Sequence, residues 1–397
     1  MNTEPWLTII GLGEDGLDGL SSASRLALDA AEIIFGGERH LKLIAAGDRA
    51  QAWPIPFDLA PMLEHRGRPV AVLASGDPFW HGVGGSIART VPKDEWQVYP
   101  QPGCLSLAAA RLGWPLEEIT TLGLHAAPFE RLLPSLCRGC RILCTLRDGD
   151  AADELAHWLC AQDLGAAEIT VLEALGGERE RVRRSLADGF SLNHVQAPVV
   201  VAIDGNSLPR GCGLPRSPGL PDDAFAHDGQ ITKRAVRALT LAALAPRPGE
   251  QLWDLGAGSA SIAVEWCLSG GCACAVEQHA KRVANIDANI IAFGLQNKLT
   301  RTIGKHLDCL DPLPTPDAVF VGGGASAELI DALWERMPKQ CRLVINAVTL
   351  ETEALLIDHQ ARLGGTLMRI ELASLDKLGT HRGWQPARPI VQWTVAR

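Results

Sequence analysis

The sequence lacks the features of several protein classes. It contains no run of about eighteen apolar residues, the length that a membrane-spanning helix needs. Its start, MNTEPWL, has no basic region of the kind that opens a signal peptide. We therefore expect a cytoplasmic protein with no membrane partner. Aromatic residues make up only 5% of the chain and the net charge is −9, so we expect no nucleic-acid partner either.

Metal-binding patterns are also missing. The eleven cysteines are scattered along the chain. The C-x-x-C pair of Cys137 and Cys140 is followed by no second pair or His-x-x-x-His that would complete a zinc site. Cys272 and Cys274 belong to an alternating run typical of a strand, where buried thiols are common. We expect no metal, and we expect reduced thiols, as in the cytoplasm.

The length of 397 residues predicts two or three domains. The stretch GNSLPRGCGLPRSPGLPD, residues 205–222, is rich in proline and glycine and reads as a semi-extended linker. It separates domains at 1–204 and 223–397. Both alternate short apolar strands with helical patterns, which predicts α/β folds with largely parallel sheets.

We place seven strands in each half. The C-terminal seven have helices between the first five, and little room for a helix between the last two. In the N-terminal half the predicted strands are residues 6–11, 31–35, 69–74, 96–99, 141–146, 168–173 and 198–203. In the C-terminal half they are residues 251–255, 272–277, 299–303, 317–321, 341–346, 366–373 and 389–395.

The first glycine-rich loop, GLGEDG, follows the first predicted strand. Gly11, Gly13 and Gly16 give the spacing G-x-G-x-x-G of dinucleotide-binding loops. Such a site also needs an acidic residue at the end of the next strand to hold a ribose. Glu32 lies before that strand and Glu38 lies past its end, so the pattern does not favour a dinucleotide site.

The second glycine loop, in QLWDLGAGS, has a different chemistry. Gly256 and Gly258 allow a sharp turn before a helix that starts near Ser259, whose free N–H groups face a ligand. Asp254 at the strand end would repel a phosphate but suits an ammonium or sulfonium group. Glu277 ends the next strand, nineteen residues after Gly258, where ribose hydroxyls are held. Together these residues predict an S-adenosylmethionine site, against the alternative of a tight turn with two surface acids.

Each half resembles a known family. The N-terminal half resembles the tetrapyrrole (corrin and porphyrin) methylases in GLGEDG, in ASGDPFWHGVG and in VLEALGGERERV. The C-terminal half resembles the decarboxylating precorrin methyltransferase domain in ITKRAVRALTLAALAPRPGEQLWDLGAGS, DAVFVGGG and INAVTLETE. The fused order is that of a cobalamin-biosynthesis family whose members methylate carbons 5 and 15 of the macrocycle and decarboxylate the acetate on carbon 12.

The resemblance implies a two-lobed tetrapyrrole methylase fold followed by a Rossmann-like, seven-stranded methyltransferase fold. It implies a precorrin tetrapyrrole as substrate and S-adenosylmethionine as cofactor, with carbon 5 assigned to the N-terminal half. The first glycine loop would face the substrate through Gly11, Gly13 and Asp15. Further cofactor contacts would come from Ser75, Gly76, Asp77 and, in DAVFVGGG, Gly322. Further copies of the same chain are the expected protein partners, in a homo-oligomer.

Decarboxylation calls for a cation that holds the departing carboxylate in a dry pocket. Lys233 and Arg237 precede the first C-terminal strand at a spacing of four, which places them on one helix face. Asn346 ends the fifth strand. We predict that these three residues are catalytic, with a solvated amphipathic helix as the alternative for the two cations.

Other polar residues have weaker assignments. Four arginines are predicted to lie on a solvated helix face, with the propionates of the substrate as the alternative partners: Arg179, Arg181, Arg183 and Arg184. Three histidines are predicted to be structural or exposed, with proton transfer as the alternative: His227, His279 and His306. Two rival functions are RNA methylation and non-catalytic tetrapyrrole binding. The acidic balance and few aromatics count against the first, and two cofactor-type loops count against the second.

Overall fold

The computed structural model describes residues 5–397 and divides into two units, with the boundary between Gly213 and Leu214. The first four residues, which belong to the region without signal-peptide features, lie outside the described part. Among the described residues no helix combines the length and the apolar character that crossing a membrane requires. The cytoplasmic location stays a prediction.

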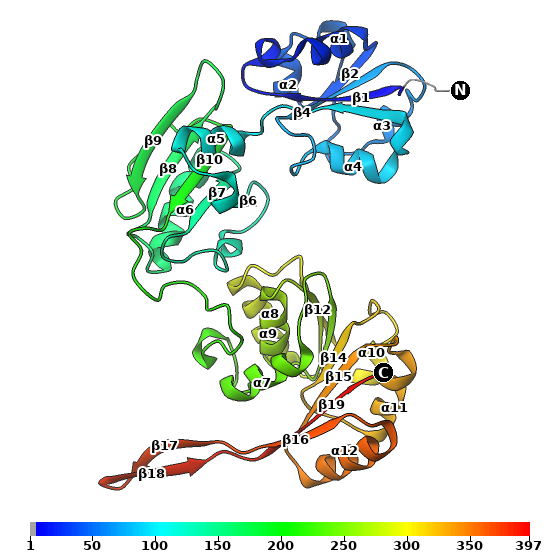
Figure 1. Cartoon of the computed structure of the whole chain (residues 1–397), viewed down its shortest axis with the longest axis vertical. Helices are drawn as coiled ribbons and strands as arrows, with labels where there is room; N and C mark the ends of the chain where they lie inside the picture. The colour runs from blue at the N-terminus through cyan, green and yellow to red at the C-terminus, as the bar shows by residue number, and fades with distance from the viewer. Residues whose placement is uncertain (1–4) are drawn as a thin grey trace. The chain divides into compact units, whose positions relative to one another are not determined.

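The first sheet of the N-terminal unit is parallel, with strand order β3-β2-β4-β1-β5 (Figure 1). Leu7 and Ile9 pack in one core, while Ile10 and Leu12 pack in another, because alternate residues of a strand point to opposite faces. Both faces are therefore buried. The strands and helices are β1 (Leu7–Leu12), α1 (Ser22–Ala30), β2 (Ile33–Gly36), α2 (Glu38–Leu43), β3 (Ala50–Ala52), α3 (Ala60–Leu63), β4 (Val70–Ser75), α4 (Val83–Thr90) and β5 (Trp96–Tyr99).

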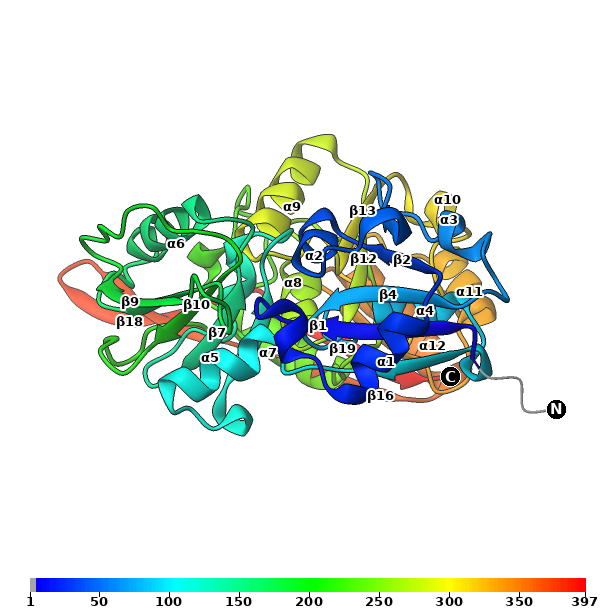
Figure 2. The same cartoon turned by 90° about the horizontal axis from the view of Figure 1, so that it is seen from above.

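The second sheet of this unit has the order β6-β7-β10-β8-β9. Figure 2 shows α5 and α6 on opposite faces of it. Leu105 of α5 packs with Leu143 of β7, whereas Leu155 of α6 packs with the neighbouring Ile142. The elements are α5 (Cys104–Leu112), β6 (Thr120–Gly123), β7 (Arg141–Thr145), α6 (Asp150–Ala161), β8 (Glu168–Glu173), β9 (Arg181–Leu186) and β10 (Val199–Asp204).

This second sheet corrects two expectations. Only the β6–β7 pair is parallel, and the pairs β7–β10, β10–β8 and β8–β9 are antiparallel. The arginine-rich segment predicted as a helix face is strand β9, in which half-buried and exposed residues alternate. Arg181 and Arg183 share one side of β9, and both bind the fully buried carboxylate of Glu173. The Glu173 carboxylate is the counter-ion of both arginines, so this charged segment can form a strand of the sheet.

The C-terminal unit holds a seven-stranded sheet with the order β13-β12-β11-β14-β15-β19-β16, parallel except for β19. The predicted α/β architecture is confirmed. The elements are α7 (Arg234–Leu244), β11 (Gln251–Leu255), α8 (Ser261–Leu268), β12 (Cys272–Glu277), α9 (Ala280–Ala292), β13 (Leu299–Ile303), α10 (His306–Cys309), β14 (Ala318–Val321), α11 (Ala327–Arg336), β15 (Arg342–Ala347), α12 (Leu350–Leu363), β16 (Thr366–Ile370) and β19 (Ile390–Ala396).

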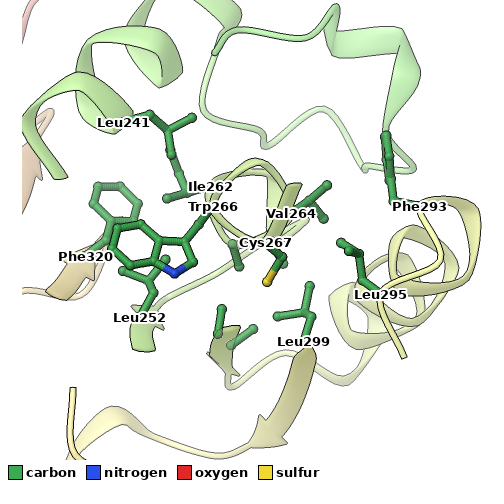
Figure 3. Close-up of a cluster of buried hydrophobic side chains, with 14 of the residues drawn as sticks. Leu241, Leu252, Ile262, Val264, Trp266, Cys267, Phe293, Leu295, Leu299 and Phe320 are labelled. Atoms are coloured by element: carbon green, nitrogen blue, oxygen red, sulfur yellow. The ribbon is translucent and has the colours of Figure 1, made fainter. Parts of the chain in front are cut away.

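Two apolar cores sandwich this sheet. Figure 3 shows the core on the side of α7, α8 and α9, where Trp266 is completely buried among aliphatic and aromatic side chains that include Leu241, Leu252 and Phe320. The opposite core contains residues of α11 and α12, among them Leu333. Burial on both faces explains the nearly continuous apolar strands, and it leaves the loops at the strand ends for function.

A hairpin separates the last two strands of the sheet, β16 and β19. It consists of β17 (Ala373–Leu378) and β18 (His381–Pro386) and extends away from the sheet (Figure 1). The sequence prediction had β16 continuing to residue 373 and missed the hairpin, because its residues show no buried face. Leu375 and Trp384 lie opposite each other and are 55% and 74% exposed.

The proline- and glycine-rich segment 205–222 is attached at both ends. Leu208 belongs to the core of the second N-terminal sheet, and Leu220 belongs to a core of the C-terminal unit. Leu214 packs against that same C-terminal core. Between these anchors, residues 215–218 are exposed.

Candidate active sites

The glycine turn after β11 brings two loops into contact. Gly256 and Gly258 have φ angles of 70° and 59°, which favour glycine. A Cβ on Gly256 would lie 2.8 Å from the carbonyl oxygen of Gly323, in the loop after β14. The amide of Gly322 donates to Leu255 O at 2.9 Å. Backbone without side chains therefore lines the carboxyl-terminal edge of the sheet at this point. A side chain on Gly256 would occupy the space between the two loops.

Glu277, at the end of β12, lies directly against this turn. One carboxylate oxygen accepts the Gly258 N–H at 2.9 Å, and the other accepts the His279 N–H at 2.8 Å. Each oxygen has one further lone pair for another donor. The residue is only 2% exposed, so Glu277 both fixes the glycine turn and presents a buried acceptor beside it.

Asp254, in β11, is almost completely buried beneath the turn. Its Oδ2 accepts the Ala263 N–H of α8 at 3.2 Å. Its Oδ1 is buried and has no hydrogen-bond partner among residues 5–397. Burial, with a smaller contribution from the nearby charge of Glu277, raises the pKa of Asp254 to about 7. An orphaned carboxylate oxygen at this position fits a cationic ligand. Ser259 is also buried, and its hydroxyl likewise lacks a partner in the described chain.

His306, at the start of α10, is part of this site, whereas the sequence analysis predicted a structural or exposed residue and left proton transfer as the alternative. A Cβ on Gly324 would lie 3.0 Å from its Cε1, and one on Gly256 would lie 3.4 Å from its Nε2. Burial lowers the pKa of His306, opposed by the charge of Glu277. The available signal was its place just after the end of β13, because ligands of such sheets bind at the carboxyl ends of strands.

The structure corrects the prediction that Arg237 anchors a substrate carboxylate. Its side chain is completely buried. Nε donates to Glu265 at 2.6 Å and Nη1 donates to Asp222 at 3.1 Å. The guanidinium also binds the backbone carbonyls of Thr232 and Leu220. The same Glu265 carboxylate accepts two N–H groups of the linker end. Arg237 therefore ties the linker to α7 and has no surface for a substrate.

Lys233 is exposed, whereas Asn346 is buried and hydrogen-bonded to two protein side chains. Lys233 precedes α7, its side chain is 62% exposed, and its Nζ lies 3.9 Å from Asp222. Asn346 donates to Thr240 Oγ1 at 3.0 Å and accepts from Gln392 at 2.9 Å. It thus has a fixed orientation near the end of β15. The sequence pattern did not reveal Thr240 or Gln392, since their partners are distant in the chain.

In the N-terminal unit, three loops meet at glycines. A Cβ on Gly11 would lie 2.0 Å from the carbonyl oxygen of Gly76, and one on Gly76 would lie 2.6 Å from Cα of Gly103. Asp77 accepts the Phe79 N–H at 2.8 Å in the turn that follows β4. Ser75 ends β4 and is exposed. The predicted cofactor residues Ser75, Gly76 and Asp77 therefore form one continuous turn.

The first glycine loop also folds tightly on itself. Cβ atoms on Gly13 and Gly19 would lie 2.5 Å and 2.1 Å from carboxylate oxygens of Asp15. Glu14, which the sequence did not single out, contacts Arg39 and Arg179 instead. Ser75 Oγ is bound by Arg39 at 3.0 Å and by His40 Nε2 at 2.9 Å. Burial, together with the Arg39 charge, lowers the pKa of His40 to about 4.

Two α/β folds, each with a glycine turn at a strand end, define a two-domain enzyme of the methyltransferase class. Residues 6–189 match the tetrapyrrole (corrin/porphyrin) methylases, and residues 223–397 match the precorrin methyltransferase domain. The chain is 44% identical to a precorrin-6Y C(5,15)-methyltransferase [decarboxylating] of Sinorhizobium sp. over 98% of this chain and 96% of that protein. A Mycobacterium tuberculosis protein of the same name is 38% identical over 98% of this chain and 100% of its own length.

One solved structure, the C-terminal domain of precorrin-6Y C5,15-methyltransferase from Rhodobacter capsulatus, is 52% identical. The match covers 46% of this chain and 100% of the chain in that structure, with a TM-score of 0.46. The full-length similarity shows that the chain belongs to the family of decarboxylating precorrin-6Y C(5,15)-methyltransferases. It is a methyltransferase of cobalamin biosynthesis.

Proposed function

We propose that this enzyme methylates carbons 5 and 15 of a precorrin-6 type tetrapyrrole and decarboxylates the acetate on carbon 12, giving a precorrin-8 type product. The N-terminal unit would methylate carbon 5, and the C-terminal unit would methylate carbon 15 and release carbon dioxide. The observation that carries the proposal is the full-length similarity, joined to a separate glycine-turn site in each unit.

S-adenosylmethionine would supply an electrophilic methyl group on a sulfonium. In the C-terminal unit, the residues that would hold it are Asp254, Gly256, Gly258, Ser259, Glu277 and Gly322. The fit rests on the orphaned oxygen of Asp254, on the bare backbone at Gly256 and on the acceptors of Glu277. In the N-terminal unit the cofactor residues would be Ser75, Gly76 and Asp77, and the substrate would face Gly11, Gly13 and Asp15.

Decarboxylation breaks one carbon–carbon bond, releases carbon dioxide and leaves an electron pair that the conjugated macrocycle absorbs before a proton is added. Lys233 is proposed as the cation that holds the carboxylate beforehand, because its ammonium is exposed. Asn346 is proposed to direct an amide toward the substrate from an orientation fixed by Gln392 and Thr240.

Self-association is the remaining proposal about partners. The exposed Leu375–Trp384 pair on the β17–β18 hairpin supports a homo-oligomer, because adjacent apolar side chains that together form an exposed patch mark an interaction surface. Light scattering on the wild-type chain and on Trp384→Ser tests it. A variant with the same molar mass as the wild type would remove the hairpin from the interface.

Calorimetry and product mass test the central proposal. Titration of the full chain should show two equivalents of S-adenosylmethionine bound, with the tetrapyrrole present if the N-terminal site is weak. Incubation with a precorrin-6 type substrate should yield a product with two added methyl groups and one carbon dioxide lost. One bound equivalent, with the Ser75→Ala and wild-type titrations identical, would contradict the N-terminal site.

A further inference from the structure

A cavity of about 590 Å³ opens in the N-terminal unit beside the first glycine loop. Charged side chains from three segments meet there: the loop after β1, helix α2 and the connection from β8 to β9. Three cations and two carboxylates give it a positive balance. The lining residues are Glu14, Glu38, Arg39, Lys42, Leu43 and Arg179.

Two of the charged groups, the buried Glu14 and the half-buried Arg39, are bound to each other. The Glu14 side chain is only 7% exposed and contacts both Arg39 and Arg179. Arg39 donates in addition to Ser75 Oγ at 3.0 Å. Glu14 therefore neutralises one positive charge, and Arg39 links the cavity wall to the proposed cofactor turn.

The other two cations keep donors free for a ligand. The Arg179 side chain is 56% exposed, and its hydrogen bonds to Glu14 and Gln196 are long, at 3.3 Å and 3.4 Å. The Lys42 side chain is 81% exposed, and Glu38, its partner at 3.8 Å, is 80% exposed. Both cations keep N–H donors that no protein acceptor holds at short range.

The structure distinguishes, by their contacts, four arginines that have similar positions in the sequence. Arg181 and Arg183 are bound to the buried Glu173, and Arg184 pairs with Glu168 outside the cavity. Only Arg179 of this group lines the cavity. A guanidinium suits a carboxylate because its N–H groups match the two carboxylate oxygens.

We infer that this cavity binds a carboxylate side chain of the tetrapyrrole substrate, which Arg179 and Lys42 contact directly. Arg39 is a positioning residue that connects the bound carboxylate to Ser75. Anchoring an acidic side chain here would fix the macrocycle relative to the turn of Ser75–Asp77. The inference rests on the proposed function and adds to it a determinant of substrate specificity in the N-terminal unit.

The test compares Arg179→Gln, Lys42→Gln and the double variant with the wild-type full chain. Binding of uroporphyrin, a polycarboxylate tetrapyrrole, is measured by fluorescence, and KM and kcat are measured for carbon 5 methylation. Each single change should raise Kd and KM about tenfold and the double change about a hundredfold, with kcat nearly unchanged. Arg179→Lys should restore part of the affinity. The C-terminal unit is unchanged in every variant. Differences in affinity between variants therefore measure binding at the cavity of the N-terminal unit.

Three controls fix the interpretation. Arg184→Gln should bind the probe like the wild type, and the methyl ester of uroporphyrin should bind all variants equally. Arg39→Gln should lower kcat as well as affinity, because it also releases Ser75. A folded double variant with unchanged Kd and KM would overturn the inference while leaving the methyl transfer itself intact. A wild type that binds the probe through Arg179 but transfers no methyl group would refute the proposed function alone.

Discussion

The two glycine loops of this enzyme use the same residue type for different contacts. Near the end of β1, Gly11 leaves room for the carbonyl of Gly76, and just after β1, Gly13 leaves room for the side chain of Asp15. After β11, Gly256 and Gly258 form a turn, and the Gly258 N–H donates to the Glu277 carboxylate. Asp254 lies beneath this turn, and its Oδ1 has no hydrogen-bond partner in the described chain. The first loop closes on protein atoms, whereas the second leaves polar groups unsatisfied.

This difference shows what a glycine pattern can and cannot indicate. Glycine marks a place where backbone must approach something closely, and that neighbour is as often protein as ligand. Acidic residues at the adjacent strand ends distinguish the two loops, since only the second has them. The predictions below test the contrast, in order of decreasing effect.

Removing the Asp254 carboxylate should have the largest effect. We expect Asp254→Ala to lose carbon dioxide release and methyl transfer to carbon 15 by more than about a hundredfold, since a charge contact with a cation is worth about 3 kcal/mol. Methyl transfer to carbon 5 should persist, because the N-terminal site is unchanged. Product mass and carbon dioxide release measure both.

Asp254→Asn is the matched control. It can still accept the Ala263 N–H, so it separates the carboxylate charge from its role at the start of α8. It should fold like the wild type and share the catalytic loss. Continued carbon dioxide release by either variant would show that the C-terminal unit is not the decarboxylase.

Gly11→Ala should destabilise the N-terminal unit by about 3 kcal/mol, since its Cβ would overlap a backbone oxygen that cannot move independently. Gly13→Ala meets only the flexible Asp15 side chain and should cost less than about 1 kcal/mol. Urea unfolding of each variant measures the difference. Equal losses would mean that the two glycines do not differ in the way the contacts indicate.

The sequence predicted the sheet strands of the C-terminal unit well, because apolar strands buried on both faces stand out between polar helices. It missed β3, β6, β9 and the β17–β18 hairpin, whose residues are charged, exposed or only half-buried. At the C-terminal site, the sequence spacing correctly predicted that Glu277 lies next to the turn at Gly258. Spacing failed for Arg237, because its acidic partners Glu265 and Asp222 lie far away in sequence, and burial by distant partners leaves no local pattern.

The pH dependence should be moderate and should belong to the C-terminal site. A free Asp ionises near pH 3.9, whereas burial, with the Glu277 charge, raises the pKa of Asp254 to about 7. The folded state holds this proton more tightly, so this group's contribution to stability falls as pH rises from about 4 through about 7.

Binding of a sulfonium should follow the opposite trend, since it favours the carboxylate and should strengthen up to about pH 7. His306 has a lowered pKa and stays neutral over the upper part of that range. Calorimetry across this range checks the slope for the C-terminal site. Asp254→Asn should flatten it, and an unchanged slope in that variant would assign the titration to another group.

The smallest effect concerns the link between the units. Leu208 and Cys212 pack in the N-terminal core and Leu214 and Leu220 in the C-terminal core, while residues 215–218 form the longest exposed run of the segment 205–222. Brief trypsin treatment should therefore cut first after Arg216 and release two folded pieces, because an unanchored backbone reaches a protease most easily. Urea unfolding of the nicked protein should match that of the intact chain to within about 0.5 kcal/mol. Arg216→Gln should slow this cut without changing either unit. Cleavage elsewhere with 215–218 protected, or a loss of stability on nicking, would show that the segment is packed and that the two units depend on it.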